Sequence, residues 1–126
     1  MKSPQQAIFD VVFSICLDLG YDTYNYLPPE DARLPFVYVG EQFDQDLVTK
    51  DTVYGNVQQR IHIYGDLNDR IAVSTMVNEI RQGVRRLRRA DGFCITVIDA
   101  NAQMGIEDVS GQQLTRGLLE VEFRFN

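Results

Sequence analysis

Two stretches of alternating side chains constrain the fold of this chain more than any other feature of its sequence. Residues 57–64 and residues 118–125 each place mostly apolar side chains at every second position and mostly polar ones between them. Successive side chains of a β-strand point to opposite faces of a sheet, so both stretches predict strands with one buried face and one solvent-exposed face. Such a sheet needs a second layer over its apolar face.

Residues 4–19 predict a helix that supplies part of this layer. Ser3 is placed to cap the helix, Pro4 suits its first position, and Gln6 lies where it can complete a capping box. Gly20 is the expected end. Between these residues one buried stripe recurs at helical spacing. It consists of Ala7, Ile8, Val11, Val12, Ile15 and Leu19.

A second helix is expected after Gly65 and Asp66 interrupt the alternating strand. Asp66 or Asn68 can cap its start, and its pattern continues to about Arg89. The expected buried face again has apolar residues three or four positions apart. These residues are Val73, Met76, Val77, Ile80, Val84 and Leu87.

The remaining segments predict three more strands and two long loops. The strands are expected at residues 21–27, 35–46 and 93–99, where apolar and aromatic side chains predominate. Residues 44–54 are charged without clean periodicity, and residues 101–113 contain two glycines. Each of these two segments is interpreted as a loop, the first as the exposed tip of a long hairpin. Long loops in compact domains commonly carry function.

Together these elements predict an α+β fold in a single domain of residues 1–126. The expected order is α-β-β-β-α-β-β, with a mostly antiparallel sheet of four to five strands and two helices packed on one face. A chain of 126 residues can bury roughly two-thirds of the surface that it exposes when unfolded. No stretch of about eighteen uncharged apolar residues occurs, so we expect no membrane partner.

A second apolar stripe adjoins the buried one on the first helix. It consists of Phe9, Phe13 and Leu17, and it makes the apolar arc too wide for one core face. One interpretation is a helix that lies between the sheet and a loop. The other is that the stripe packs on a neighbouring subunit, which makes these three residues candidate subunit contacts.

Opposite charges are segregated along the chain. The net charge is -6, but five arginines fall within nine residues, and outside that window seven bases face eighteen acids. The arginines are expected to fill the last turns of the second helix, where positive charge complements the carbonyl end of the helix dipole. They are Arg81, Arg85, Arg86, Arg88 and Arg89.

The expected hairpin tip is mostly acidic, so it can complement the arginines of another copy. A head-to-tail interface requires two different complementary patches. The basic candidates for this contact are Arg81, Arg85, Arg88 and Arg89, and the candidates at the tip are Asp44, Asp46, Lys50 and Asp51. The alternative interpretation is that both patches are solvated surface.

No residue pattern in the chain indicates catalysis or a cofactor. The only histidine is His62, in the middle of an alternating strand, where a packing role is usual. Asp44, Asp46 and Asp51 resemble a cation site superficially, but the glycine and the distal glutamate of an EF-hand loop are missing. We therefore expect a protein that is not an enzyme and that binds no metal or cofactor.

Four segments, in their order and in their pattern of residue types, resemble those of one protein family. The segments are PFVYVGEQ, VYGNVQQRIHIYGD, DRIAVSTMVNEIRQGVRRL and the closing strand GLLEVEFRF. In this order they are similar to the tail-terminator and tail-completion proteins of siphophages. With the N-terminal helix, the likeness covers almost the whole chain.

The resemblance implies a virion protein at the head-proximal end of the tail, assembled in the host cytoplasm. It implies that six copies form a ring on the last ring of the major tail tube protein, stop tube polymerisation and present a surface to the head connector. DNA would pass through the ring without specific binding, which an acidic channel wall favours. Two alternatives remain open: a head-completion or neck connector protein, and a small nucleic-acid-binding regulator that uses the arginines.

Overall fold

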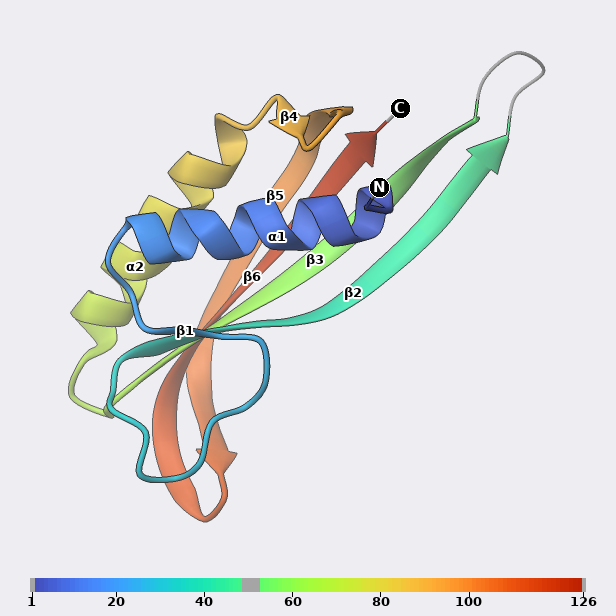
Figure 1. The fold of residues 1–126 in the computed structure, drawn as a ribbon. Coiled ribbons are helices and arrows are strands. Elements are labelled where there is room, and N and C mark those ends of the chain that lie inside the picture. Colours follow the sequence, from blue (N-terminus) through green and yellow to red (C-terminus); the bar gives the residue numbers. More distant parts are fainter. Residues whose placement is uncertain (1, 49–52, 126) are drawn as a thin grey trace.

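Two helices and six strands make up the fold (Figure 1). The computed structural model describes residues 2–48 and 53–125, with the backbone alone described at 45–48, 53 and 54. In chain order the elements are α1 (Pro4–Asp18), β1 (Thr23–Tyr24), β2 (Phe36–Val48), β3 (Val53–Gly65), α2 (Arg70–Arg85), β4 (Arg89–Ala90), β5 (Phe93–Val109) and β6 (Gln112–Phe125).

The six strands form one mixed sheet in the order β1-β2-β3-β6-β5-β4. β1 pairs parallel with β2, and the other described pairs are antiparallel. The α+β class is confirmed, but the expected count of four to five strands is wrong. The strand expected at residues 21–27 shortens to two residues, and the unexpected β4 is also two residues long, too short to produce a periodic pattern.

Both helices cover the same face of the sheet (Figure 1). One apolar cluster joins the inward side chains of α1 and α2 to those of the four long strands. Ile61 lies opposite Leu119, and Val57 lies opposite Phe123, so the two alternating strands set their apolar rows side by side. On the other face, a smaller cluster of Phe36 and its neighbours packs under residues 24–34.

Local hydrogen bonds set the ends of α1. The N–H of Gln6 donates to Ser3 Oγ at 3.1 Å, which confirms Ser3 as the cap. The side chain of Gln6 donates to Asp10 and does not complete the expected capping box. At the other end Gly20 has a φ of 89°, and its N–H donates to the carbonyl oxygen of Leu17. A glycine in this left-handed conformation is a common helix end.

α2 differs from the expected helix at both ends. Its N-cap is Asp69, not Asp66 or Asn68, and its C-cap is Arg86. The helix therefore stops before Arg89, because the chain turns there to pair as β4 with the start of β5.

Both expected long loops are wrong. β2 and β3 continue through most of residues 44–54, and their ladder extends to the pair of Val48 with Val53. β5 continues through most of residues 101–113, in a ladder with β6 that is interrupted by one bulge. Strand ends that extend beyond the helices bury few side chains, so they carry little of the apolar periodicity by which strands are found.

Candidate functional site

The described residues contain no arrangement typical of a metal site. No three His, Cys, Asp or Glu side chains among them lie close enough to hold a metal ion. No helix within the same residues is long and apolar enough to cross a membrane.

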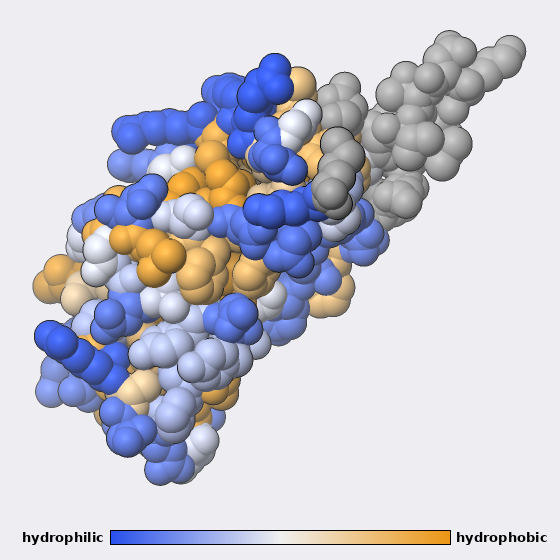
Figure 2. Space-filling view, viewed as in Figure 1, coloured by the Kyte–Doolittle hydropathy of each residue, from blue (hydrophilic) through white to orange (hydrophobic). Residues whose placement is uncertain are grey.

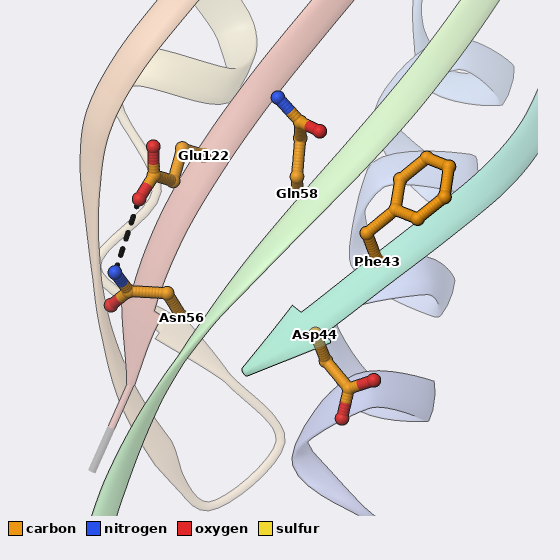
Figure 3. Close-up of a pocket in the computed structure, with 5 residues that line it drawn as sticks. All are labelled: Phe43, Asp44, Asn56, Gln58 and Glu122. Atoms are coloured by element: carbon orange, nitrogen blue, oxygen red, sulfur yellow. Dashed lines mark hydrogen bonds between the residues drawn. The ribbon is translucent and has the colours of Figure 1, made fainter. Parts of the chain in front are cut away.

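One shallow pocket of about 260 Å³ lies where β2, β3 and β6 meet (Figure 3). Its lining comprises Phe43, Asp44, Asn56, Gln58 and Glu122. In Figure 3, Asn56 and Glu122 point toward each other across neighbouring strands, and Asn56 Nδ2 donates to Glu122 Oε2 at 3.1 Å. Asp44 lies on the more distant strand. The pocket lining holds no nucleophile and base within hydrogen-bond reach of each other, so it does not indicate catalysis.

Charged and phenolic groups on the face away from the helices are paired with one another. His62 Nε2 lies 2.7 Å from Glu41 Oε1, and Tyr64 Oη donates to Glu107 Oε2 at 2.7 Å. The backbone N–H of Glu41 and then His62 hold the pKa of Glu41 below its usual value. Burial and the bond to Glu107 raise the pKa of Tyr64. These pairs join neighbouring parts of the sheet, while His62 Nδ1 is buried without a hydrogen-bond partner among the described residues.

The arginine group lies at the end of α2 and just beyond it. Arg81 and Arg85 belong to the helix, whereas Arg88 and Arg89 follow it, so the expectation that all five fill the last helical turns is wrong. The Arg88 guanidinium donates to the carbonyl oxygens of Arg85 and Leu87, at 2.9 Å each, and completes the helix end. None of the five arginines forms an ion pair within the described parts of the chain.

A groove of about 430 Å³ separates the end of α2 from β5. Arg85 and Arg88 line one side of it, and residues 96–100 line the other. Within the second side, Asp99 accepts hydrogen bonds from the Ala100 N–H and the Asn101 side chain. Among the described side chains neither Arg85 nor Arg88 has a carboxylate partner, and both lie beside an exposed strand.

The acidic candidates lie along and beyond the end of β2. Asp44 is exposed and accepts a hydrogen bond from Gln5 Nε2 at 3.0 Å. Asp46 lies in β2 opposite Gly55. The structure does not describe the side chain of Asp46 or any part of Lys50 and Asp51. The acidic character of this end of β2 therefore follows from the sequence.

The end of the β2–β3 hairpin extends past the rest of the sheet (Figure 1). β6 pairs with β3 only as far as Gly55, which lies opposite Asp46 in β2, so residues 47–48 and 53–54 beyond that row form a two-stranded arm. The structure therefore replaces the expected loop by a projecting pair of strands.

The acidic end of β2, which carries Asp44 and Asp46, and the arginine group lie at the same end of the sheet, on opposite edges. The ladders place Asp46 opposite Gly55, Gly55 opposite Phe125, and Phe125 opposite Ile95. The N–H of Ile95 in turn donates to the carbonyl oxygen of Arg88. One row of residues thus joins the two charged patches, and within one chain they do not meet.

The second apolar stripe of α1 is only partly buried in the core. Phe9 and Phe13 are half-buried against the main apolar cluster, with their ring centroids 6.1 Å apart. Leu17 is 51% exposed. Figure 2 shows apolar side chains gathered over the C-terminal half of α1, with hydrophilic residues around them. A subunit contact through this stripe stays a prediction.

The outer edge of β5 is the feature that sequence reasoning missed. Ile98 and Ile106 are exposed along it. A signal was present, because Ala100, Ala102, Met104 and Ile106 alternate with polar residues. Two glycines and a charged flank nevertheless favour a loop over a strand in this segment.

The comparisons with known proteins give a likeness in fold. No family model and no curated protein matches the chain. A chain from the virion of a native gene transfer agent particle is similar at a TM-score of 0.70 and 14% identity, over 98% of this chain and 94% of that one. The type 4 fimbrial biogenesis protein PilO from Pseudomonas aeruginosa gives a TM-score of 0.44 at 14% identity, over 98% and 73% of the two chains. The first likeness shows a shared fold, and the second is too weak to support an argument.

Proposed function

We propose that this protein is a non-enzymatic structural component of a phage-type virion and that it acts as a tail terminator. Six copies form a ring on the last ring of the major tail tube protein, stop the tube from growing and give the head connector a surface to bind. The observation that carries this proposal is the fold shared, over 98% of the chain, with a chain of a gene transfer agent virion. The order of the sequence segments similar to tail terminators supports the same role.

The distribution of charge supports assembly into a ring. A ring forms by heterologous contacts, in which one patch of each copy binds a different patch of the next. The acidic end of β2 and the arginines of the groove are two such patches, and they lie on opposite edges of the sheet. Charges of this kind orient the partners and speed their association more than they raise affinity.

Labelling of purified particles tests where the protein acts. With an antibody against this chain, we expect electron micrographs to show one labelled position per particle, at the junction of head and tail, because the terminator caps the head-proximal end of the tube. Isolated tails should carry the label at one end. Label on isolated heads, with none on isolated tails, would instead favour a head-completion or neck connector protein.

The unpaired arginines favour one other function, a small regulator that binds nucleic acid. We expect little binding of duplex DNA at physiological salt, because the chain carries a net charge of -6 and such binding depends on clustered Lys and Arg. A gel-shift titration measures this, with a variant carrying Arg85→Ala and Arg88→Ala for comparison. Tight binding that falls steeply with salt and is lost in the variant would support the regulator.

A further inference from the structure

β5 has a long outer edge that the described strands leave unpaired. β6 pairs with one side of β5 as far as Val109, whereas β4 covers the other side only at Phe93 and Cys94. From Thr96 to Val109, no described strand pairs with the outer side. Alternate residues of an antiparallel edge direct their N–H and C=O groups outward, so roughly seven residues of this edge present outward backbone groups, of which the Ala100 N–H donates to Asp99 Oδ1.

This edge has little of the protection that exposed strands normally carry. Between Thr96 and Val109 there is no proline, lysine or arginine. Ile98 is 44% exposed and Ile106 is 67% exposed. The bulge beside Val97 and three acids, Asp99, Glu107 and Asp108, are its protecting features. Proteins usually shield such an edge by charge, by proline or by covering it, so this edge is suited to pairing with another strand.

β2 provides a second and different edge. β1 covers it only at Val37 and Tyr38, and within the arm its described strand partner is β3 alone. A two-stranded hairpin is marginally stable by itself, so a further strand would stabilise the arm. Three antiparallel steps separate β2 from β5, so the two strands run in opposite directions. A copy added in the same orientation would set its β2 antiparallel to β5.

Charge and space favour the same contact. The segment from Asp44 to Val48 carries two acids and no base, and the groove beside β5 presents Arg85 and Arg88 against one acid, Asp99. β4 occupies the outer side of β5 before Ile95. An added strand must therefore pair on the side that leads to Val109, next to this groove.

We propose that, in the ring inferred above, the segment from Asp44 to Val48 of one copy pairs antiparallel with the outer edge of β5 in the next copy. The acids of the added strand then lie beside Arg85 and Arg88, and the sheets of neighbouring copies join. This inference rests on the proposed function for the existence of the ring. Each copy offers one edge of each kind, so the contact is heterologous and repeats from copy to copy.

The hydrogen bonds at the two edges identify the amides that this contact must protect. The N–H of Val37 donates outward to Asp22, at 2.8 Å, and the N–H of Ile95 donates outward to Arg88, at 3.0 Å. Residues in phase with these two along the ladders also direct their N–H outward. They are Asp44, Asp46 and Val48 in β2, and Ala102, Met104 and Ile106 in β5. The outward N–H of Ala100 already donates to Asp99 Oδ1, so it does not report the contact.

Hydrogen exchange at single-amide resolution tests the contact directly. The free protein and assembled tails are exposed to D2O, quenched, dissociated and read by fragmentation mass spectrometry. In tails, we expect the amides of Asp46, Val48 and Ala102 to exchange at least about tenfold more slowly than in the free protein, as a new backbone bond requires. Asn101 and Gln103 serve as internal controls, because their amides face β6 and are already bonded.

The pattern of protection separates the possible failures. Absence of the protein from tails would defeat the proposed function. Its presence in tails without slower exchange in β5 would defeat only the strand pairing. Protection of β5 without protection of β2 would mean that β5 pairs with a different strand, and it would overturn the proposal as well.

A proline variant supplies an independent measurement. Ala102→Pro removes one outward N–H and no bond to β6, and an edge strand tolerates proline at such a position. We expect it to fold but to be recovered on tails at least roughly tenfold less than wild type, since one lost backbone bond with a steric clash costs more than about 1.4 kcal/mol. Ala102→Val is the matched control, because it keeps the N–H. Equal recovery of both variants would contradict the contact.

Charge reversal tests the arginine side of the same contact. Arg85→Glu with Arg88→Glu should lower incorporation into tails, and adding Asp44→Lys with Asp46→Lys in the same chain should restore part of it. Arg33→Glu with Arg86→Glu changes the net charge equally at arginines outside the groove, so it should have little effect. If the variant with Arg85→Glu and Arg88→Glu is incorporated into tails as well as wild type is, the arginines do not contribute to the contact.

Discussion

Cells infected by a phage that lacks functional copies of this protein are expected to contain tails of irregular, overgrown length, together with DNA-filled heads that carry no tail. Tube subunits add to the end of a growing tube as long as that end stays open. A ring that binds the last tube ring removes the site of addition. Tail lengths in a lysate of an amber mutant, measured by electron microscopy, check this expectation.

The distribution of lengths distinguishes the terminator from its nearest alternative. Wild-type protein supplied from a plasmid should restore a single narrow peak of tail length and joined particles. Tails of normal length that fail to join heads would point to a head-completion or neck connector protein. Tails of normal length that do join heads would show that the protein is needed neither to stop tube growth nor to join heads to tails.

The sequence predicts the core of the fold because buried apolar residues recur with the period of the helix or strand that carries them. Residues 57–64 and 118–125 pair with each other at their apolar rows, and Val73 to Val84 form the buried face of α2. Ser3 and Gly20 mark the ends of α1 through local hydrogen bonds. The capping bonds depend on neighbours in sequence, and the apolar rows depend on one shared core. Both determinants lie within a single chain, so its sequence reveals them.

The candidate contacts are predicted less well, because they depend on what lies outside the core. Asp44 and Asp46 are expected in the tip of a hairpin, but they belong to a strand, and the charged and amide residues 44–46 leave no apolar row by which to recognise it. The bulge beside Val97 shifts the alternation of β5 and hides its continuation. An edge strand with exposed side chains on both faces does not carry the apolar pattern of a buried strand.

The distance between the sheet and α2 is set by a glycine, and this dependence gives the largest expected effect on stability. A Cβ atom at Gly117 would lie 2.6 Å from Val77 Cγ2 and 3.1 Å from Val73 Cγ1. Both valines are buried, and a β-branched side chain on a helix has essentially one rotamer, so neither methyl group can turn away. A side chain at position 117 must therefore push α2 off the sheet.

Gly117→Val is expected to lower the free energy of unfolding by roughly 3 kcal/mol, the upper range for overpacking a core. For a chain of this length, that lowers Tm by about 10 °C, which calorimetry or circular dichroism measures. Gly105→Val is the matched control on the adjacent strand, where an added Cβ meets nothing within 4 Å. Valine suits a strand better than glycine, so Tm there should stay the same or rise slightly. Equal losses at both positions would show that glycine flexibility in the β5–β6 ladder, and not close packing of α2, sets the stability.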